Sequence, residues 1–219
     1  MSRPFFPRIR PGAVCAETSG RILVAAALCL LATGSLRLLA ERMELIRKGV
    51  MVDPSVCECQ GIGSGWKDIR TRYFKVQMDR DVDAEAVERQ LRRRFFFPGR
   101  QTPRDLGPEE GVARRIDAIC DRAMDILNVF PKMDSPGIKI FKGKADLGAA
   151  YRTLTGRSED VKAFHVQDCR MIYTSEETIN DSVIAHEIAH AIVDAHYNGI
   201  PPPKVGEMLA SYVDMHLAD

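Results

Sequence analysis

The chain has 219 residues, of which 45% are apolar, 28% charged and 7% aromatic, with 31 basic and 30 acidic side chains. These values exclude a disordered chain and a large two-domain enzyme, and they are typical of one globular domain with a hydrophobic core. The near-neutral charge also argues against a nucleic-acid-binding domain, which usually carries a clustered basic face. We therefore expect no nucleic-acid partner.

Residues 1–40 are expected to direct export, as a signal peptide or an N-terminal membrane anchor. Four Arg precede the uncharged run at 22–36, and Arg37 follows it. A basic segment before an apolar one is typical of a secretory signal, and Gly34 or Ala40 could precede the cleavage point. The alternative is a retained anchor, with Arg37 snorkelling to the interface. In both cases we expect the rest of the chain outside the cytoplasm, periplasmic, secreted or anchored, with membrane contact only through this segment.

Export would make disulfides available to the four cysteines beyond this segment, Cys57, Cys59, Cys120 and Cys169. Their even number permits two disulfides, and free or partly paired structural thiols are the alternative. A zinc knuckle needs two residues between its cysteines. Because Cys57 and Cys59 are separated by only one residue, we expect no cysteine metal site.

The part of the chain that follows residue 40 is expected to begin with a linker. Residues 41–70 contain several glycines and a proline, and we expect them to form a loosely structured lead-in. Residues 71–78 alternate in polarity and are rich in β-forming side chains, so they predict a strand. Residues 83–97 predict a helix with Asp83 as its N-cap, closed by Pro98 and the following glycine.

The remaining elements predict an α+β fold. Apolar residues recur every three or four positions over 109–130, which predicts a long amphipathic helix. Residues 137–142 predict a short strand, and 161–166 with 169–174 predict a hairpin. Two helices follow this hairpin in the prediction.

The first of these two helices carries the clearest chemical signal in the chain. Thr174, with Glu177 three residues later, is a candidate capping box at its start, and Gly199 with the prolines beyond would end it. Within the helix lies the pattern HExxH, as HEIAH at 186–190. Since residues four apart on a helix differ by about 40° in direction, His186 and His190 can bind one ion.

Glu187 completes the chemistry that this spacing predicts. It directly follows the first histidine, so it can reach a water on the open side of the ion and accept its proton. The pattern therefore predicts a zinc ion with His186 and His190 as ligands and Glu187 as the catalytic base.

A catalytic zinc usually has three protein ligands, and the sequence offers two candidates for the third. Glu207 lies on the second helix, predicted over 201–217 after a proline turn. His196 lies six residues after His190, the spacing of HExxHxxGxxH, in which the glycine turns the chain. Val193 stands at the place of that glycine, and in a continuing helix His196 is rotated about 240° from His190. We expect Glu207 rather than His196 to be the third ligand.

HEIAH, followed 17 residues after its second His by Glu207 in the string GEMLASY, resembles the gluzincin metallopeptidases, in particular the small peptidase MA-like domains. The resemblance is specific over residues 160–214 and extends to 71–159 only in the order of strands and helices. It implies a zincin-like domain over 71–219, with a small mixed sheet, an HExxH helix and a glutamate-bearing helix. In such a fold the edge strand before the motif helix, here 169–174, lines the cleft and accepts an extended peptide.

The resemblance also implies roles for individual residues. Zinc would be bound by His186, His190 and Glu207, with Glu187 as general base. Gluzincins commonly place an Asp four residues after the ligand Glu, where it orients a ligand His. Ser211 stands there in this chain, so Asp214 or Asp194 would have to take that role. The candidates for stabilising the oxyanion are Tyr151, His165, Tyr173 and Tyr212.

The leading expectation is an exported zinc-dependent peptidase that acts on a peptide or protein substrate. Glu187 would take a proton from a zinc-activated water, and would then give it to the leaving amine. Two alternatives remain open from the sequence: a zincin-fold binding module without turnover, and a metzincin-like peptidase with His196 as third ligand. A retained N-terminal segment would also suit a membrane-anchored structural protein.

Overall fold

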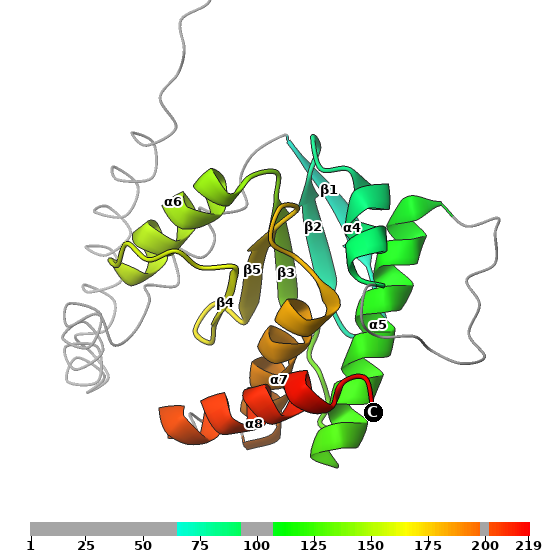
Figure 1. Cartoon of the computed structure of the whole chain (residues 1–219), viewed down its shortest axis with the longest axis vertical. Coiled ribbons are helices and arrows are strands. Elements are labelled where there is room, and N and C mark those ends of the chain that lie inside the picture. The colour runs from blue at the N-terminus through cyan, green and yellow to red at the C-terminus, as the bar shows by residue number, and fades with distance from the viewer. Residues whose placement is uncertain (1–64, 93–106, 198–201) are drawn as a thin grey trace, which may run out of the picture. The chain divides into compact units, whose positions relative to one another are not determined.

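The computed structural model describes residues 65–92, 107–197 and 202–219. All of them belong to the second of two compact units into which the chain divides, Met1–Gln60 and Gly61–Asp219. These residues form a five-stranded mixed sheet and five helices, which confirms the predicted α+β class (Figure 1). No helix in this part of the chain is long and apolar enough to span a membrane. The predicted export segment lies outside the described residues.

The sheet has the order β1-β2-β3-β5-β4. Strands β2 and β3 are parallel, as are β3 and β5, whereas β1 and β4 run antiparallel to their neighbours at the two edges. The strands are β1 (Trp66–Arg70), β2 (Lys75–Asp79), β3 (Gly137–Phe141), β4 (Ala163–Val166) and β5 (Met171–Ser175). Each of the four predicted strands is present, although the first begins at Lys75 rather than at residue 71.

Two positions in the sheet differ from the expectation. Strand β1 falls in the predicted lead-in at 41–70, because its side chains are mostly exposed and show no apolar pattern, although its backbone pairs with β2. Strand β5, expected at the edge of the cleft, lies between β3 and β4. Its last four residues are all buried, as in a central strand, so β4 is the edge strand.

The helices are α4 (Ala84–Gln90), α5 (Pro108–Leu127), α6 (Lys144–Thr155), α7 (Asp181–Tyr197) and α8 (Pro203–His216). Asp83 caps α4 as predicted, by accepting hydrogen bonds from the N–H groups of Glu85 and Ala86. Helix α4 is shorter than the predicted 83–97, because it ends at Gln90, and Pro98 lies outside the described residues. Helix α5 ends at Asn128 in the left-handed conformation, with φ 53°.

Helix α7 begins at a different residue from the one expected. The side chain of Asn180 accepts a hydrogen bond of 3.0 Å from the N–H of Val183, so Asn180 caps the helix. The predicted capping box at Thr174 is wrong, because Thr174 pairs with β3 and β4 inside strand β5. Helix α6 was not predicted from the sequence, and the predicted helix after the proline turn is present as α8.

Helices cover both faces of the sheet (Figure 1). Ile138, Ile140 and Ile172 point to the face covered by α4, α5 and α7, and they belong to the main hydrophobic core. Helix α6 lies on the opposite face, where Tyr151 packs edge-on against Phe164 with the ring centroids 5.0 Å apart. Thus α7 packs on one face of the sheet, which holds this helix in position.

The described cysteines have two different states. Cys120 on α5 is a buried free thiol, and burial raises the pKa of this thiol well above its usual range. Cys169, just before β5, is disulfide-bonded. Because Cys120 is free, the four cysteines after residue 40 do not form two disulfides among themselves.

Lys139 on β3 provides a test of the packing on the face covered by α6. Its side chain is buried, with Nζ 4.4 Å from the centre of the Trp66 ring, and burial lowers its pKa to about 8. The unfolded chain keeps a lysine pKa of about 10.4, so between these values the unfolded state binds the extra proton and stability rises with pH. We expect Lys139 to add on the order of 2 kcal/mol to the free energy of unfolding between pH 8 and pH 10.

The Lys139→Met variant should lack this contribution, since methionine fills similar space without a charge. Urea titrations of both proteins at pH 8 and pH 10 give the change in the free energy of unfolding between these pH values for the wild type and for the variant. An equal rise in the variant and in the wild type would contradict the low pKa of Lys139.

Candidate metal centre

Helix α7 presents three of the HEIAH residues, His186, Glu187 and His190, on the side away from the core. Its Ile184, Ile188 and Ile192 are fully buried, whereas the two histidines and Glu187 are partly exposed. This division follows from the helical period, because residues four apart share a face. The buried isoleucines fix the helix, and the helix fixes His186 and His190 one turn apart.

Three side chains converge at this position from two helices. His186 Nε2 lies 3.5 Å from Glu207 Oε2, and His190 Nε2 lies 3.5 Å from Glu207 Oε1. All three ligand atoms lie within 4.8 Å of one another. Tetrahedral ligands at about 2.0 Å from a zinc ion are separated by about 3.3 Å, so the three donors fit a zinc site.

Helix α8 packs against α7 at Gly206, beside His190. A Cβ atom at Gly206 would lie 3.6 Å from His190 Nδ1, which is ordinary van der Waals contact, so an alanine would also fit at this position. Gly206, Ala210 and Val213 form the buried side of α8. Glu207 is the neighbour of Gly206, and therefore its carboxylate reaches the two histidines across the seam between α7 and α8.

The electrostatics of the site follow from burial. Burial raises the pKa of Glu187 to about 8, the charge of Glu207 adds to the rise, and a hydrogen bond from the backbone of His165 opposes it. Burial also lowers the pKa of His190, with Glu207 raising it and His186 lowering it further. A histidine without its extra proton has the lone pair that a metal ligand needs. A divalent cation would favour the charged form of Glu187.

A cavity of about 560 Å³ opens over these residues, between α7, α8 and the edge strand β4. His165 of β4 lies in its wall, with its ring parallel to that of His190 and the centroids 6.3 Å apart. His165 Nδ1 faces Asp194 Oδ2 of α7 at 3.5 Å. From the sequence, His165 was a candidate for stabilising the oxyanion and Asp194 a candidate for orienting a ligand histidine. Their pairing could not be predicted, because it depends on β4 lying beside α7.

His196, the alternative third ligand, lies elsewhere. Helix α7 continues through Val193 to Tyr197 without a break. His196 is exposed near its end, with its ring 4.9 Å from that of Tyr197. It is not part of the His186, His190 and Glu207 group.

The two aspartates considered for orienting a ligand histidine have other partners. Asp214 accepts a hydrogen bond from the hydroxyl of Ser182. Asp194 faces His165. Within the described ranges, therefore, neither carboxylate forms a hydrogen bond with His186 or His190.

Two of the four candidates for oxyanion stabilisation line the cavity, namely Tyr151 and His165. The Tyr151 hydroxyl donates to Glu159 at 3.3 Å. Tyr173 is fully buried in the sheet, and its hydroxyl has no hydrogen-bond partner in the part of the chain described here. Tyr212 is exposed on α8. Position in the cavity thus leaves Tyr151 and His165 as candidates.

The arrangement can hold a divalent ion and move a proton beside it. It offers two nitrogen donors, one carboxylate donor and a further carboxyl group, Glu187, all on the wall of one cavity. Comparisons with protein-family models, with curated proteins and with solved structures found no match to this chain.

Proposed function

We propose that this chain is an exported zinc-dependent metallopeptidase of the gluzincin type, with a zincin-like fold. The observation that carries the proposal is the convergence of His186, His190 and Glu207, with nitrogen-to-oxygen distances of 3.5 Å, beside Glu187 on the wall of a cavity. Two histidines and one carboxylate are a donor set that catalytic zinc uses, with the fourth position left open.

The residues of the site divide the chemistry among them. His186, His190 and Glu207 would hold the zinc, which when bound lowers the pKa of water and polarises a carbonyl. Glu187 accepts a proton from the attacking water and returns it to the leaving amine. The backbone N–H of His165 donates a hydrogen bond to Glu187 and so holds its carboxylate in place.

The edge strand supports a peptide or protein as the substrate. Among the described strands, β4 has a sheet neighbour on one side only, and its Ala163 and His165 line the cavity. An extended peptide can add to such an edge through main-chain hydrogen bonds. We therefore propose β4, rather than 169–174, for the role expected of the edge strand.

A second candidate is a zincin-fold binding module that holds zinc without turnover. It is favoured by the partners of Asp194 and Asp214, which face His165 and Ser182 rather than the ligand histidines. Without a carboxylate behind them, the two imidazoles are less strongly oriented and less basic.

Metal analysis and peptide hydrolysis test the proposal together. We expect the purified chain to contain one zinc, to cleave members of a mixed peptide library, and to lose this activity with a chelator and regain it with zinc. Stoichiometric zinc without cleavage of any peptide would favour the binding module. A chain that binds no zinc would contradict both candidates.

Export is the second part of the proposal and has its own test. It is supported by the four Arg before the uncharged run at 22–36 and by the disulfide at Cys169, because disulfides are typical of exported proteins. We expect residues 1–45, fused to a reporter that works only outside the cytoplasm, to give signal. A silent reporter at normal expression would contradict export.

A further inference from the structure

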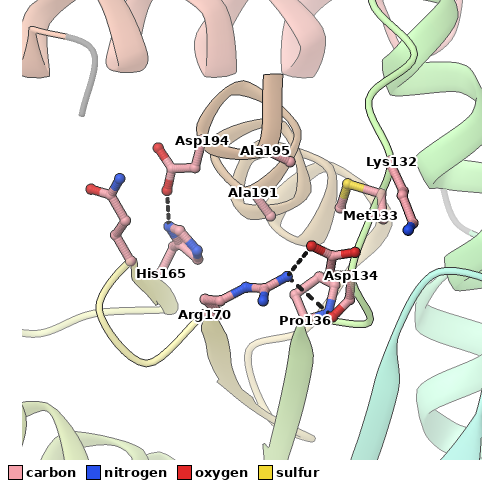
Figure 2. A pocket seen from close by; sticks show the side chains of 10 residues that line it. Lys132, Met133, Asp134, Pro136, His165, Arg170, Ala191, Asp194 and Ala195 are labelled. Carbon is pink, nitrogen blue, oxygen red and sulfur yellow. Dashed lines mark hydrogen bonds and ion pairs between the residues drawn. The ribbon is translucent and has the colours of Figure 1, made fainter. Parts of the chain in front are cut away.

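A second cavity of about 380 Å³ adjoins the metal cavity near the C-terminal end of α7 (Figure 2). The two cavities share His165, Gln167 and Asp194 in their walls. Figure 2 shows the Asp194 carboxylate and the His165 ring facing each other at this boundary. A ligand bound over the metal site can therefore extend past His165 into the second cavity.

The position of Glu187 indicates which part of a substrate extends there. Glu187 and His186 also line a third cavity of about 350 Å³ towards the start of α7, with Asn180 and Ser182, but they do not line the second cavity. Glu187 gives its proton to the leaving amine, so the amine side of the scissile bond lies on its side, towards the third cavity. The acyl side then lies towards the second cavity.

The charges of the second cavity favour a cation. Arg170 is already bound by Asp134, with its guanidinium 3.1 Å from the main-chain oxygen and 3.9 Å from Oδ2 (Figure 2). Lys132 is exposed, whereas the side chain of Asp194 is 20% exposed and lies 3.5 Å from the His165 ring. Within the described residues no lysine or arginine forms an ion pair with Asp194, so its largely buried carboxylate is open to a cation from a ligand.

The walls and distances suit a long basic side chain. Met133 and Ala191 give the cavity an apolar surface on which the methylene groups of lysine or arginine can pack. Asp194 lies one helical turn, about 5.4 Å, beyond His190, and an extended peptide covers that distance in one to two residues of about 3.3 Å each.

We infer that the second cavity binds the side chain of a lysine or arginine at the second residue before the scissile bond, with Asp194 accepting its hydrogen bonds. This inference rests on the proposed function, and it makes the chain a peptidase selective for basic peptides. Asp194 is then the residue that determines specificity, and Lys132 opposes the binding of a cation.

Hydroxamate probes separate this inference from the metal site. The zinc-loaded full chain is titrated calorimetrically with acetohydroxamate and with acetyl-Xaa-alanine hydroxamates, in which Xaa is arginine, norleucine or glutamate. We expect the arginine probe to bind about tenfold more tightly than the norleucine probe. The reason is that arginine can form a charge-assisted hydrogen bond with a partly buried carboxylate, and such a bond gives an affinity gain of about this size. The glutamate probe should be the weakest.

Two variants assign the preference to charge. In Asp194→Asn the ratio of the arginine and norleucine affinities should fall close to one. In Lys132→Ala the same ratio should rise, because a repelling charge is removed, and this exposed residue can be replaced without loss of packing. Equal affinities for the three probes, or tightest binding of the glutamate probe, would overturn the inference. Failure of acetohydroxamate to bind would overturn the proposed function and this inference with it.

Discussion

Glu187→Gln is expected to retain the metal and to reduce kcat/KM for peptide hydrolysis by on the order of 10² or more. Glutamine keeps the shape of glutamate, and its amide oxygen can still accept the hydrogen bond from the backbone of His165. It cannot accept a proton from water, so the chemical step loses its base. Zinc content measured beside initial rates checks both parts of this expectation.

The matched control is Glu110→Gln, an equivalent change at an exposed residue of α5 that forms a surface ion pair with Arg114. We expect this control to retain the wild-type rate. Unchanged turnover in Glu187→Gln would show that Glu187 is not the base. Loss of zinc in Glu187→Gln would contradict the expectation that Glu187 is not itself a zinc ligand.

Glu207→Ala is expected to weaken zinc binding by several kcal/mol, because it removes one of three direct ligands, and such a loss exceeds the 10- to 100-fold effect typical of supporting residues. His196→Ala should change the affinity little, since His196 lies exposed near the end of α7. Competition with a zinc chelator of known affinity gives both constants.

Met208→Ala is the control for α8, because Met208 neighbours Glu207 but is exposed. We expect it to leave the zinc affinity unchanged. Loss of metal in His196→Ala together with its retention in Glu207→Ala would reject Glu207 as third ligand. The metzincin-like alternative, with a helix broken near Val193, would then replace the gluzincin assignment.

The HEIAH part of the site could be predicted from the sequence because its geometry is local. His186 and His190 share one helix, and the helical period alone places them one turn apart. The same reasoning predicted that the helix continues past Val193, as it does to Tyr197. Asp83 as the cap of α4 was predictable for the same reason, since a cap contacts groups only two or three residues away.

Elements that depend on distant partners could not be assigned in this way. Thr174 has the spacing of a helix cap, but it lies in β5 and pairs with Ile140 and Ala163. Strand β1 has no apolar pattern of its own, and its pairing with β2 makes it a strand. In both cases the hydrogen bonds of the sheet override the local preference of the chain.

The sequence by itself determined the donor types, the spacing of His186 and His190, and the helical class of the segments that carry all three members of the group. Only the tertiary structure decided that Glu207 reaches them, since this depends on α8 packing against α7 at Gly206. It also decided that β4 is the edge strand and that His165 faces Asp194. The physical reason is that helical periodicity repeats along the chain, whereas packing joins residues whose separation in sequence carries no period.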